Sequence, residues 1–156
     1  APIMNEAFTV TAEMLAKPTR LSDVEMEFMK MHPRTGYDLL KVVDLPVPVA
    51  EIVLQHHERC DGSGYPQGLK EEEILLEAQI IAVADVVEAM VSHRPYRPAL
   101  GIRAALGEIE RNRGILYYPD VADTCRTLFK ENGFRFDDEE LDGRPSVPVA
   151  RDREAL

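Results

Sequence analysis

The strongest constraint on the fold is a stretch in the middle of the chain whose apolar residues recur at helical spacing. This stripe consists of Leu75, Ala78, Ala82, Asp85 and Ala89. Its period predicts a long helix over about residues 72–91 with one face toward a core. Asp85 stands where an apolar residue is expected. Because a lone carboxylate is costly to bury unless it is paired or bound to a metal, Asp85 is a candidate core-facing functional residue.

Other segments also predict helices, separated by prolines and glycines. Ser22 and Glu25 form a capping box, which predicts a helix over about residues 23–31. Pro33 suits the first turn of a second helix that reaches to about residue 43. Further helices are expected from Val49, over 99–112 and over 119–131, with Gly133 as the last stop signal. Because no segment has a convincing strand pattern, the predicted fold class is all-α.

The length and the patterning divide the chain into three parts. A chain of 156 residues with 45% apolar residues suits one domain with one core. Residues 1–20 are poorly patterned, so we expect an irregular amino-terminal remnant there. The helical domain is expected over residues 21–136. Residues 137–156 are acidic and contain prolines, which favours a flexible tail.

The composition excludes some classes of function. A formal net charge of −10 argues against a nucleic-acid-binding protein, because affinity for phosphate backbones comes from clustered Lys and Arg. A small anionic ligand needs only a local positive site, which a bound metal can supply. We expect a cytoplasmic protein without membrane insertion, because no apolar stretch reaches the roughly 18 residues of a membrane span. Cys60 and Cys125 form no CxxC motif and are expected to be reduced thiols.

Two adjacent histidines extend the apolar stripe of the helix that starts at Val49. Steps of three and four residues from Ile52 and Val53 lead to His56 and His57, so both are expected to face the core. With Asp85 they form a candidate metal site, because imidazole and carboxylate are common metal ligands. Adjacent helical residues point about 100° apart, so the pair suits two neighbouring ions, or one ion and one anion. Alternatively, the histidines are core residues hydrogen-bonded to their neighbours.

Several other residues have both a functional and a plain structural interpretation. His32 precedes Pro33 at a helix start, and His93 lies in a loop, so each alone favours an exposed position. The glycines of the loop Asp61–Pro66 permit close approach of a ligand, or simply a tight turn. Arg94, Tyr96 and Arg97 offer phosphate donors and a stacking ring, or a solvated loop.

The run His56–Pro66, HHERCDGSGYP, closely resembles the signature of the HD-GYP domain family. Three further segments match that family in order. His32-Pro33 with Gly36 resembles its HP-x-x-G helix, Ala84-Asp85 within IIAVADVVEAM resembles its later aspartate helix, and HRPYRPA over 93–99 resembles the segment that follows. The resemblance covers about residues 11–133.

The resemblance implies a fold, a cofactor and an activity. It implies a helical bundle of the HD superfamily with about five helices in this chain, two or three divalent metal ions (iron or manganese), and hydrolysis of cyclic di-GMP. It also implies three groups of site residues. The metal ligands would be His32, His56, His57 and Asp85. The GYP loop would consist of Asp61, Gly62, Ser63, Gly64, Tyr65 and Pro66 and would also contact diguanylate cyclase domains. The substrate-binding residues would be Arg94, Tyr96 and Arg97. No residue is assigned as the catalytic acid or base.

The chain departs from the family pattern near its beginning. Where the family places an HDxGK motif, residues 3–7 read Ile-Met-Asn-Glu-Ala, and the family's earlier helices have no counterpart. Since the aspartate of that motif would bridge the metals, its replacement predicts that metal is absent or only partly bound, and that activity is impaired.

Three interpretations follow from this departure. The chain is a phosphodiesterase domain, or a non-catalytic HD-GYP module that binds a nucleotide or a diguanylate cyclase. A third interpretation is that it is a piece of a longer active protein. Missing helices would expose apolar surface, which a homodimer could cover.

Overall fold

The computed structural model describes residues 19–92, 98–131 and 133–135, and every regular element within these ranges is helical. The elements are α2 (Asp23–Met29), α3 (His32–Leu40), α4 (Val49–Gln55), the short 3₁₀ helix η1 (Glu71–Glu73), α5 (Leu76–Val91), α6 (Ile102–Arg111) and α7 (Pro119–Lys130). The all-α prediction is thus confirmed. None of the described helices combines the length and apolarity that crossing a bilayer requires.

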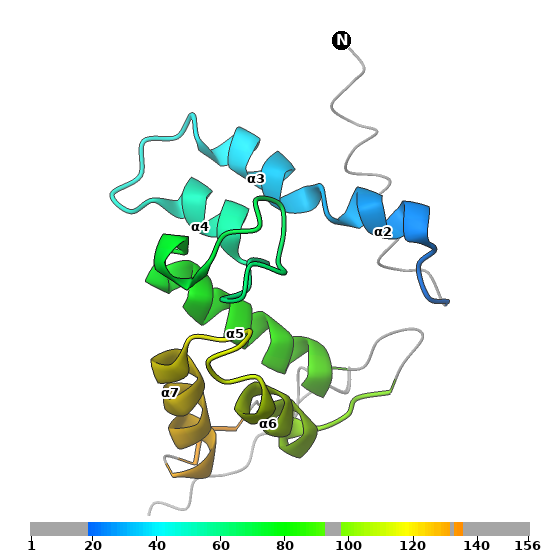
Figure 1. Ribbon diagram of the computed structural model, residues 1–156, viewed down its shortest axis with the longest axis vertical. Helices are drawn as coiled ribbons and strands as arrows, with labels where there is room; N and C mark the ends of the chain where they lie inside the picture. Colours follow the sequence, from blue (N-terminus) through cyan, green and yellow to red (C-terminus); the bar gives the residue numbers. More distant parts are fainter. Residues whose placement is uncertain (1–18, 93–97, 132, 136–156) are drawn as a thin grey trace, which may run out of the picture.

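Helix α5 lies at the centre of the molecule, between the α3–α4 pair and the α6–α7 pair (Figure 1). One face of α5 packs against α6 and α7 around a shared core. The buried residues of this core are Val83, Val87, Val91, Ala105, Ile109, Tyr117 and Ala122. The end of α5 that carries Ala78 approaches α4, so this one helix connects the core to the histidine-bearing part of the fold.

The beginning of α5 differs from the prediction. A helix was expected from about residue 72, but residues 71–73 form a 3₁₀ turn and Leu75 has an extended backbone. The side-chain amide of Gln79 donates to the carbonyls of Glu71 and Ile74, at 3.0 and 3.1 Å. Gln55 Oε1 accepts the N–H of Leu75 at 2.8 Å. The backbone groups of Glu71, Ile74 and Leu75 thus have side-chain partners and need no helical hydrogen bonds, so α5 starts only at Leu76.

The predicted buried face of α5 is also partly wrong. Ala78 and Ala82 are buried as expected, but Asp85 is exposed. The buried stripe instead follows Gln79, Val83, Val87 and Val91 toward α6 and α7. Asp85 therefore does not face the apolar core.

Helices α3 and α4 pack closely because a glycine lies at their contact. A Cβ added to Gly36 would lie 2.7 Å from Val53 Cγ1, closer than real Cβ contacts. Pro33 in the first turn of α3 is fully buried. This contact places the beginning of α3, with His32, beside the end of α4, with His56.

Helix α2 begins at the predicted capping box. Ser22 Oγ accepts the N–H of Glu25 at 3.4 Å, and Glu25 Oε2 accepts the N–H of Ser22 at 2.7 Å. The helix itself contains no buried residue. The other predicted helices are also confirmed. Helices α4 and α7 begin at the expected residues, and α3 has Pro33 in its first turn as expected. Both ends of α6 and the last residues of α3 and α7 lie one to three residues inside the expected bounds.

Candidate metal centre

Three histidines from two separate helices converge at one end of the α3–α4 pair. His32 begins α3, while His56 caps the end of α4 and His57 follows it. Each residue offers one ring nitrogen, and these three atoms lie within 4.8 Å of one another. All three side chains are half-buried. The resemblance named these residues together, and the structure brings them together.

The hydrogen bonds of His32 and His56 determine which ring nitrogen carries the proton. His32 Nδ1 lies 2.7 Å from the Met29 carbonyl oxygen, and His56 Nδ1 lies 2.6 Å from the Val53 carbonyl oxygen. Because a carbonyl oxygen can only accept, each Nδ1 must be the donor. In the neutral rings, both Nε2 atoms therefore carry a lone pair and no proton.

These two Nε2 atoms face each other at 3.2 Å. Between neutral rings this is a contact of two acceptors without a hydrogen, which is unfavourable by itself. A cation in contact with both lone pairs would remove the conflict. Metal-binding histidines commonly donate their other ring N–H to a carbonyl, as both rings do here. The donor set therefore fits a divalent ion of the kind that imidazole binds.

The surroundings favour the neutral form of His56 and His57. Burial lowers the pKa of His57 to about 3, with further contributions from His56, His32 and Arg59. Burial also lowers the pKa of His56, opposed by its bond to Val53 and by the Asp85 carboxylate. Since only a neutral imidazole has a lone pair for a metal, both shifts favour ligand function at neutral pH.

Asp85 is exposed on α5 and lies outside the histidine cluster. Its carboxylate acts on His56 and on Tyr65 electrostatically, which places it near both. The group whose potential ligand atoms all lie within 4.8 Å of one another contains the three histidines and does not include Asp85. The helical pattern predicted a buried Asp85, whereas the structure shows it exposed, close enough to His56 and Tyr65 to affect their pKa values.

The GYP loop closes over His57. Tyr65 donates its N–H to the His57 carbonyl at 3.3 Å, and the two rings stack with centroids 4.8 Å apart. Gly64 lies against the backbone of Glu58, where an added Cβ would be only 2.4 Å from Glu58 Cα. Asp61 accepts the N–H of Ser63 at 2.9 Å and turns the exposed tip of the loop. The peptide bond before Pro66 is cis.

Sequence reasoning gave no separate role to Glu58 or Arg59, which lie between the histidines and the loop. Glu58 is 2% exposed, and its carboxylate accepts two backbone N–H groups of the loop. The Arg59 guanidinium donates to the Glu58 carbonyl at 2.9 Å and lies 5.6 Å from the centre of the Tyr117 ring. Because both are charged residues just after a helix end, apolar periodicity does not identify them. The sequence feature that could have indicated a role for them is their position inside the HHERCDGSGYP run.

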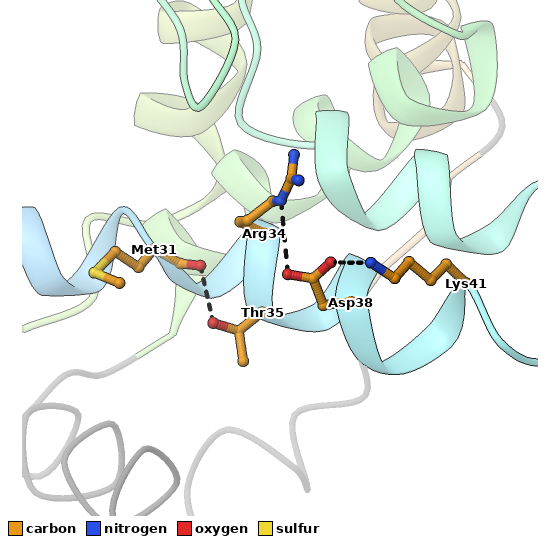
Figure 2. A network of polar contacts seen from close by, with 5 residues as sticks. All are labelled: Met31, Arg34, Thr35, Asp38 and Lys41. Carbon is orange, nitrogen blue, oxygen red and sulfur yellow. Dashed lines mark hydrogen bonds and ion pairs between the residues drawn. The ribbon is translucent and has the colours of Figure 1, made fainter. Parts of the chain in front are cut away.

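The outer face of α3 carries ordinary surface charges instead of site residues. Asp38 accepts from Lys41 at 2.6 Å and pairs with Arg34 at 3.6 Å (Figure 2). Thr35 donates its hydroxyl to the Met31 carbonyl on the same helix. Exposed pairs of this kind contribute little to stability. They therefore provide positions for control substitutions on the helix that carries His32.

Some predicted site residues lie outside the described residues. These are Arg94, Tyr96 and Arg97, together with His93 and residues 3–7, where the family motif is replaced.

Comparison with known proteins agrees with this geometry. The family model described as HD domain matches residues 9–121. A cyclic di-GMP phosphodiesterase of Thermotoga maritima is 47% identical over 120 residues, which cover 76% of this chain and 33% of that protein. The cyclic di-GMP phosphodiesterase response regulator RpfG of Xanthomonas campestris is 48% identical over 115 residues, covering 70% of this chain and 30% of the relative.

A third relative acts on a different nucleotide. The 3'3'-cGAMP-specific phosphodiesterase 3 of Vibrio cholerae is 35% identical over 103 residues, which cover 66% of this chain and 22% of that protein. The chain thus spans about a third of the length of the first two relatives, and less of the third. The match of the family model over most of the chain shows that the chain belongs to the HD domain family, and the HHERCDGSGYP run and the histidine cluster agree with the HD-GYP signature.

Proposed function

We propose that this chain is a metal-dependent phosphodiesterase domain that hydrolyses a cyclic dinucleotide, with cyclic di-GMP as the first candidate substrate. The observation that carries the proposal is the convergence of three histidines: the Nε2 atoms of His32 and His56 face each other at 3.2 Å, and a ring nitrogen of His57 lies within 4.8 Å of the same group. The names of the relatives support the substrate class: two act on cyclic di-GMP and one on cGAMP.

In this proposal His32, His56 and His57 are metal ligands, and Asp85 supplies a carboxylate from α5. Iron or manganese is the expected metal, because imidazole with carboxylate suits both. Bound divalent ions would supply positive charge against the phosphodiester and lower the pKa of water. Burial favours the neutral form of His56 and His57 because it lowers their pKa values, the Met29 and Val53 carbonyls hold the Nδ1 atoms of His32 and His56, and the Tyr65 ring covers one face of His57.

The remaining roles concern the substrate and partners. Arg94 and Arg97 contact the phosphates of the dinucleotide, and Tyr96 stacks on a base. The GYP loop, from Asp61 to Pro66, presents its exposed tip to diguanylate cyclase domains. Asp61, Ser63 and Pro66 are exposed there, which supports a contact surface.

A specific feature of the sequence favours a second function. Ile-Met-Asn-Glu-Ala at residues 3–7 replaces the motif whose aspartate would bridge the metals in the family. A site with fewer ligands binds metal more weakly. The alternative is therefore a non-catalytic module that binds the dinucleotide or a cyclase without hydrolysing it.

The first experiment measures metal and turnover in the 156-residue chain. Elemental analysis of the purified protein should find at least one equivalent of iron or manganese, and added Mn²⁺ should support hydrolysis of cyclic di-GMP. Substitution His56→Gln should remove the bound metal. Asp38→Asn, which changes an exposed charge on α3, should leave metal content unchanged.

The possible results separate the two functions. Metal with turnover supports the phosphodiesterase, whereas nucleotide binding without turnover at saturating Mn²⁺ supports the non-catalytic module. A wild-type chain that retains no metal and gains none on titration would refute the metal centre. Hydrolysis of cGAMP in preference to cyclic di-GMP would support the phosphodiesterase proposal but show that cyclic di-GMP is not the preferred substrate.

A further inference from the structure

Glu58 is the most deeply buried acidic residue in the described part of the chain, although it is not one of the histidines that form the candidate metal centre. Its carboxylate accepts the N–H of Gln67 at 2.7 Å through Oε1 and the N–H of Leu69 at 3.0 Å through Oε2. Both donors lie on the segment that leaves the GYP loop. Hydrogen bonds to a carboxylate are stronger than those between neutral groups. Glu58 thus fastens the far end of the loop to the residue that follows His57.

The residue just before Tyr65 packs against the same place. Gly64 lies so close to the backbone that an added Cβ would be 2.4 Å from Glu58 Cα and 2.5 Å from Arg59 N. Tyr65 then donates its N–H to the His57 carbonyl, and its ring stacks on the His57 ring. The chain is therefore held on both sides of Tyr65, at Gly64 and at Gln67.

This arrangement matters because, within the described part of the chain, no hydrogen bond orients the His57 ring. His32 and His56 each donate Nδ1–H to a carbonyl, whereas the described contacts of the His57 ring are with other rings. Of those rings, two belong to the other histidines. Tyr65 is thus the neighbour that can fix the plane of His57 independently of the cluster itself.

We propose that Glu58 is a positioning residue, whose two bonds to the GYP loop keep Tyr65 stacked on His57 and so hold that imidazole ready for an ion. The inference rests on the proposed function only in that it requires a bound ion. The predicted arrangement of the His57 and Tyr65 rings does not depend on the ion. Contacts behind metal ligands commonly change metal affinity about 10–100-fold when they are removed, and a change of that size is expected here.

The central test is Glu58→Gln in the full chain. Glutamine keeps the volume but has one oxygen and one NH₂, so either Gln67 or Leu69 faces a donor instead of an acceptor. In metal-free protein, the nuclear Overhauser contacts between the His57 and Tyr65 rings should weaken. Calorimetric titration with Mn²⁺ should show an affinity about 10–100-fold lower than that of the wild type.

Three further variants separate positioning from simple loss of stability. Tyr65→Ala should lower Mn²⁺ affinity as Glu58→Gln does, and combining the two should add little, because both act through one ring contact. Tyr65→Phe keeps the ring and should keep the affinity. Gln79→Ala removes buried hydrogen bonds elsewhere and should lower the unfolding midpoint without changing Mn²⁺ affinity.

Two results would overturn the proposal. Glu58→Gln that lowers the unfolding midpoint but leaves both the ring contacts and the Mn²⁺ affinity unchanged would make Glu58 a stabilising residue only. If the wild type binds no Mn²⁺, the proposed function fails, yet the metal-free ring contacts still decide this inference. Their loss in Glu58→Gln supports it, and their persistence refutes it.

Discussion

At the scale of single residues, Gly64 is a position where one methyl group changes the fit of two segments. Gly64→Ala would force the GYP loop away from Glu58, because the new Cβ would meet rigid backbone atoms at 2.4–2.6 Å. We expect a loss of about 1–3 kcal/mol in the free energy of unfolding, as for other overpacked sites. Urea denaturation measures this loss, and Mn²⁺ titration should show weaker binding.

Gly107 provides the matched control for that substitution. It lies inside α6, where an added Cβ meets only the flexible end of Arg111 at 3.3 Å. Gly107→Ala should stabilise the protein by about 0.5–1 kcal/mol, since alanine is the better helix former. Equal effects of the two substitutions would contradict the close contact at Gly64.

Cys60 gives a prediction of pH dependence. Burial, helped by Glu71, raises the pKa of its thiol from 9.0 to about 11. At pH 8 the reactive thiolate is therefore scarcer in the folded protein than in the unfolded chain, by about two orders of magnitude. Alkylation by iodoacetamide should be slow until denaturant is added. Equally fast labelling of Cys60 with and without denaturant at pH 8 would refute the shift.

The same shift affects stability at high pH. Between pH 9 and about 11 the unfolded chain releases the Cys60 proton while the folded protein retains it. The folded state then binds more protons, so its stability falls as the pH rises through this range. Cys60→Ala should reduce that slope in urea melts. Both described cysteines are free thiols, as the sequence analysis expected.

The sequence allowed the histidines to be grouped but not the way in which they are held. The HHERCDGSGYP run and His32-Pro33 identified the three imidazoles through a family resemblance. The carbonyls of Met29 and Val53 that fix their protons are backbone atoms, which no residue pattern specifies. Asp85 was expected in the core because helical periodicity cannot distinguish a position that faces the core from one that lies near a functional site.

At the scale of helices, the approach of α3 to α4 determines the distance between His32 and His56. Gly36→Ala would place a methyl group 2.7 Å from Val53 Cγ1. Valine has little rotamer freedom in a helix, so the two helices must separate. We expect a loss of about 1–3 kcal/mol in stability and weaker Mn²⁺ binding.

Removal of the opposing methyl groups should reverse the effect. In Gly36→Ala with Val53→Ala, the new methyl group occupies space that the valine left, so the double variant should recover part of the loss. A double-mutant cycle in urea should give a favourable coupling of at least about 0.5 kcal/mol. Strict additivity would show that this contact does not determine the helix spacing.

Helix positions were predictable because their apolar spacing is a local property. The beginning of α5 was not, because Leu75 and Ile74 bond to side chains of Gln55 and Gln79 instead of to a preceding helical turn. Gln55 is 20 residues away from its partner in the chain. Contacts at that separation depend on how α4 packs on α5, and periodicity within one segment carries no information about them.

At the scale of the whole molecule, burial is unevenly distributed. The apolar core lies among α5, α6 and α7, while α2 contains no buried residue. Amide hydrogen exchange should therefore be slowest in α5–α7 and fastest in α2. Added Mn²⁺ should slow exchange in α3 and α4, because an ion between His32 and His56 would link them. Uniform protection across all helices would contradict this.

The expected homodimer also belongs to this scale. Apolar side chains of α5 and α7 line a cavity of about 600 Å³, and Leu76, Ile80 and Leu128 at this cavity are exposed. Exposed apolar surface of this kind is often covered by a partner. The homodimer remains a prediction, which sedimentation of the full chain tests directly: a monomer at all concentrations would refute it.

The fixed tautomers of the histidines have a consequence for the proton balance of binding. His56 already has its proton on Nδ1, where the Val53 carbonyl holds it, and both His56 and His57 are neutral at pH 7 because their pKa values are lowered. An ion that binds their lone pairs displaces no proton from them. His56 and His57 should therefore contribute nothing to any difference between the calorimetric enthalpies of Mn²⁺ binding in Tris and in HEPES at pH 7, although these buffers differ in ionisation enthalpy.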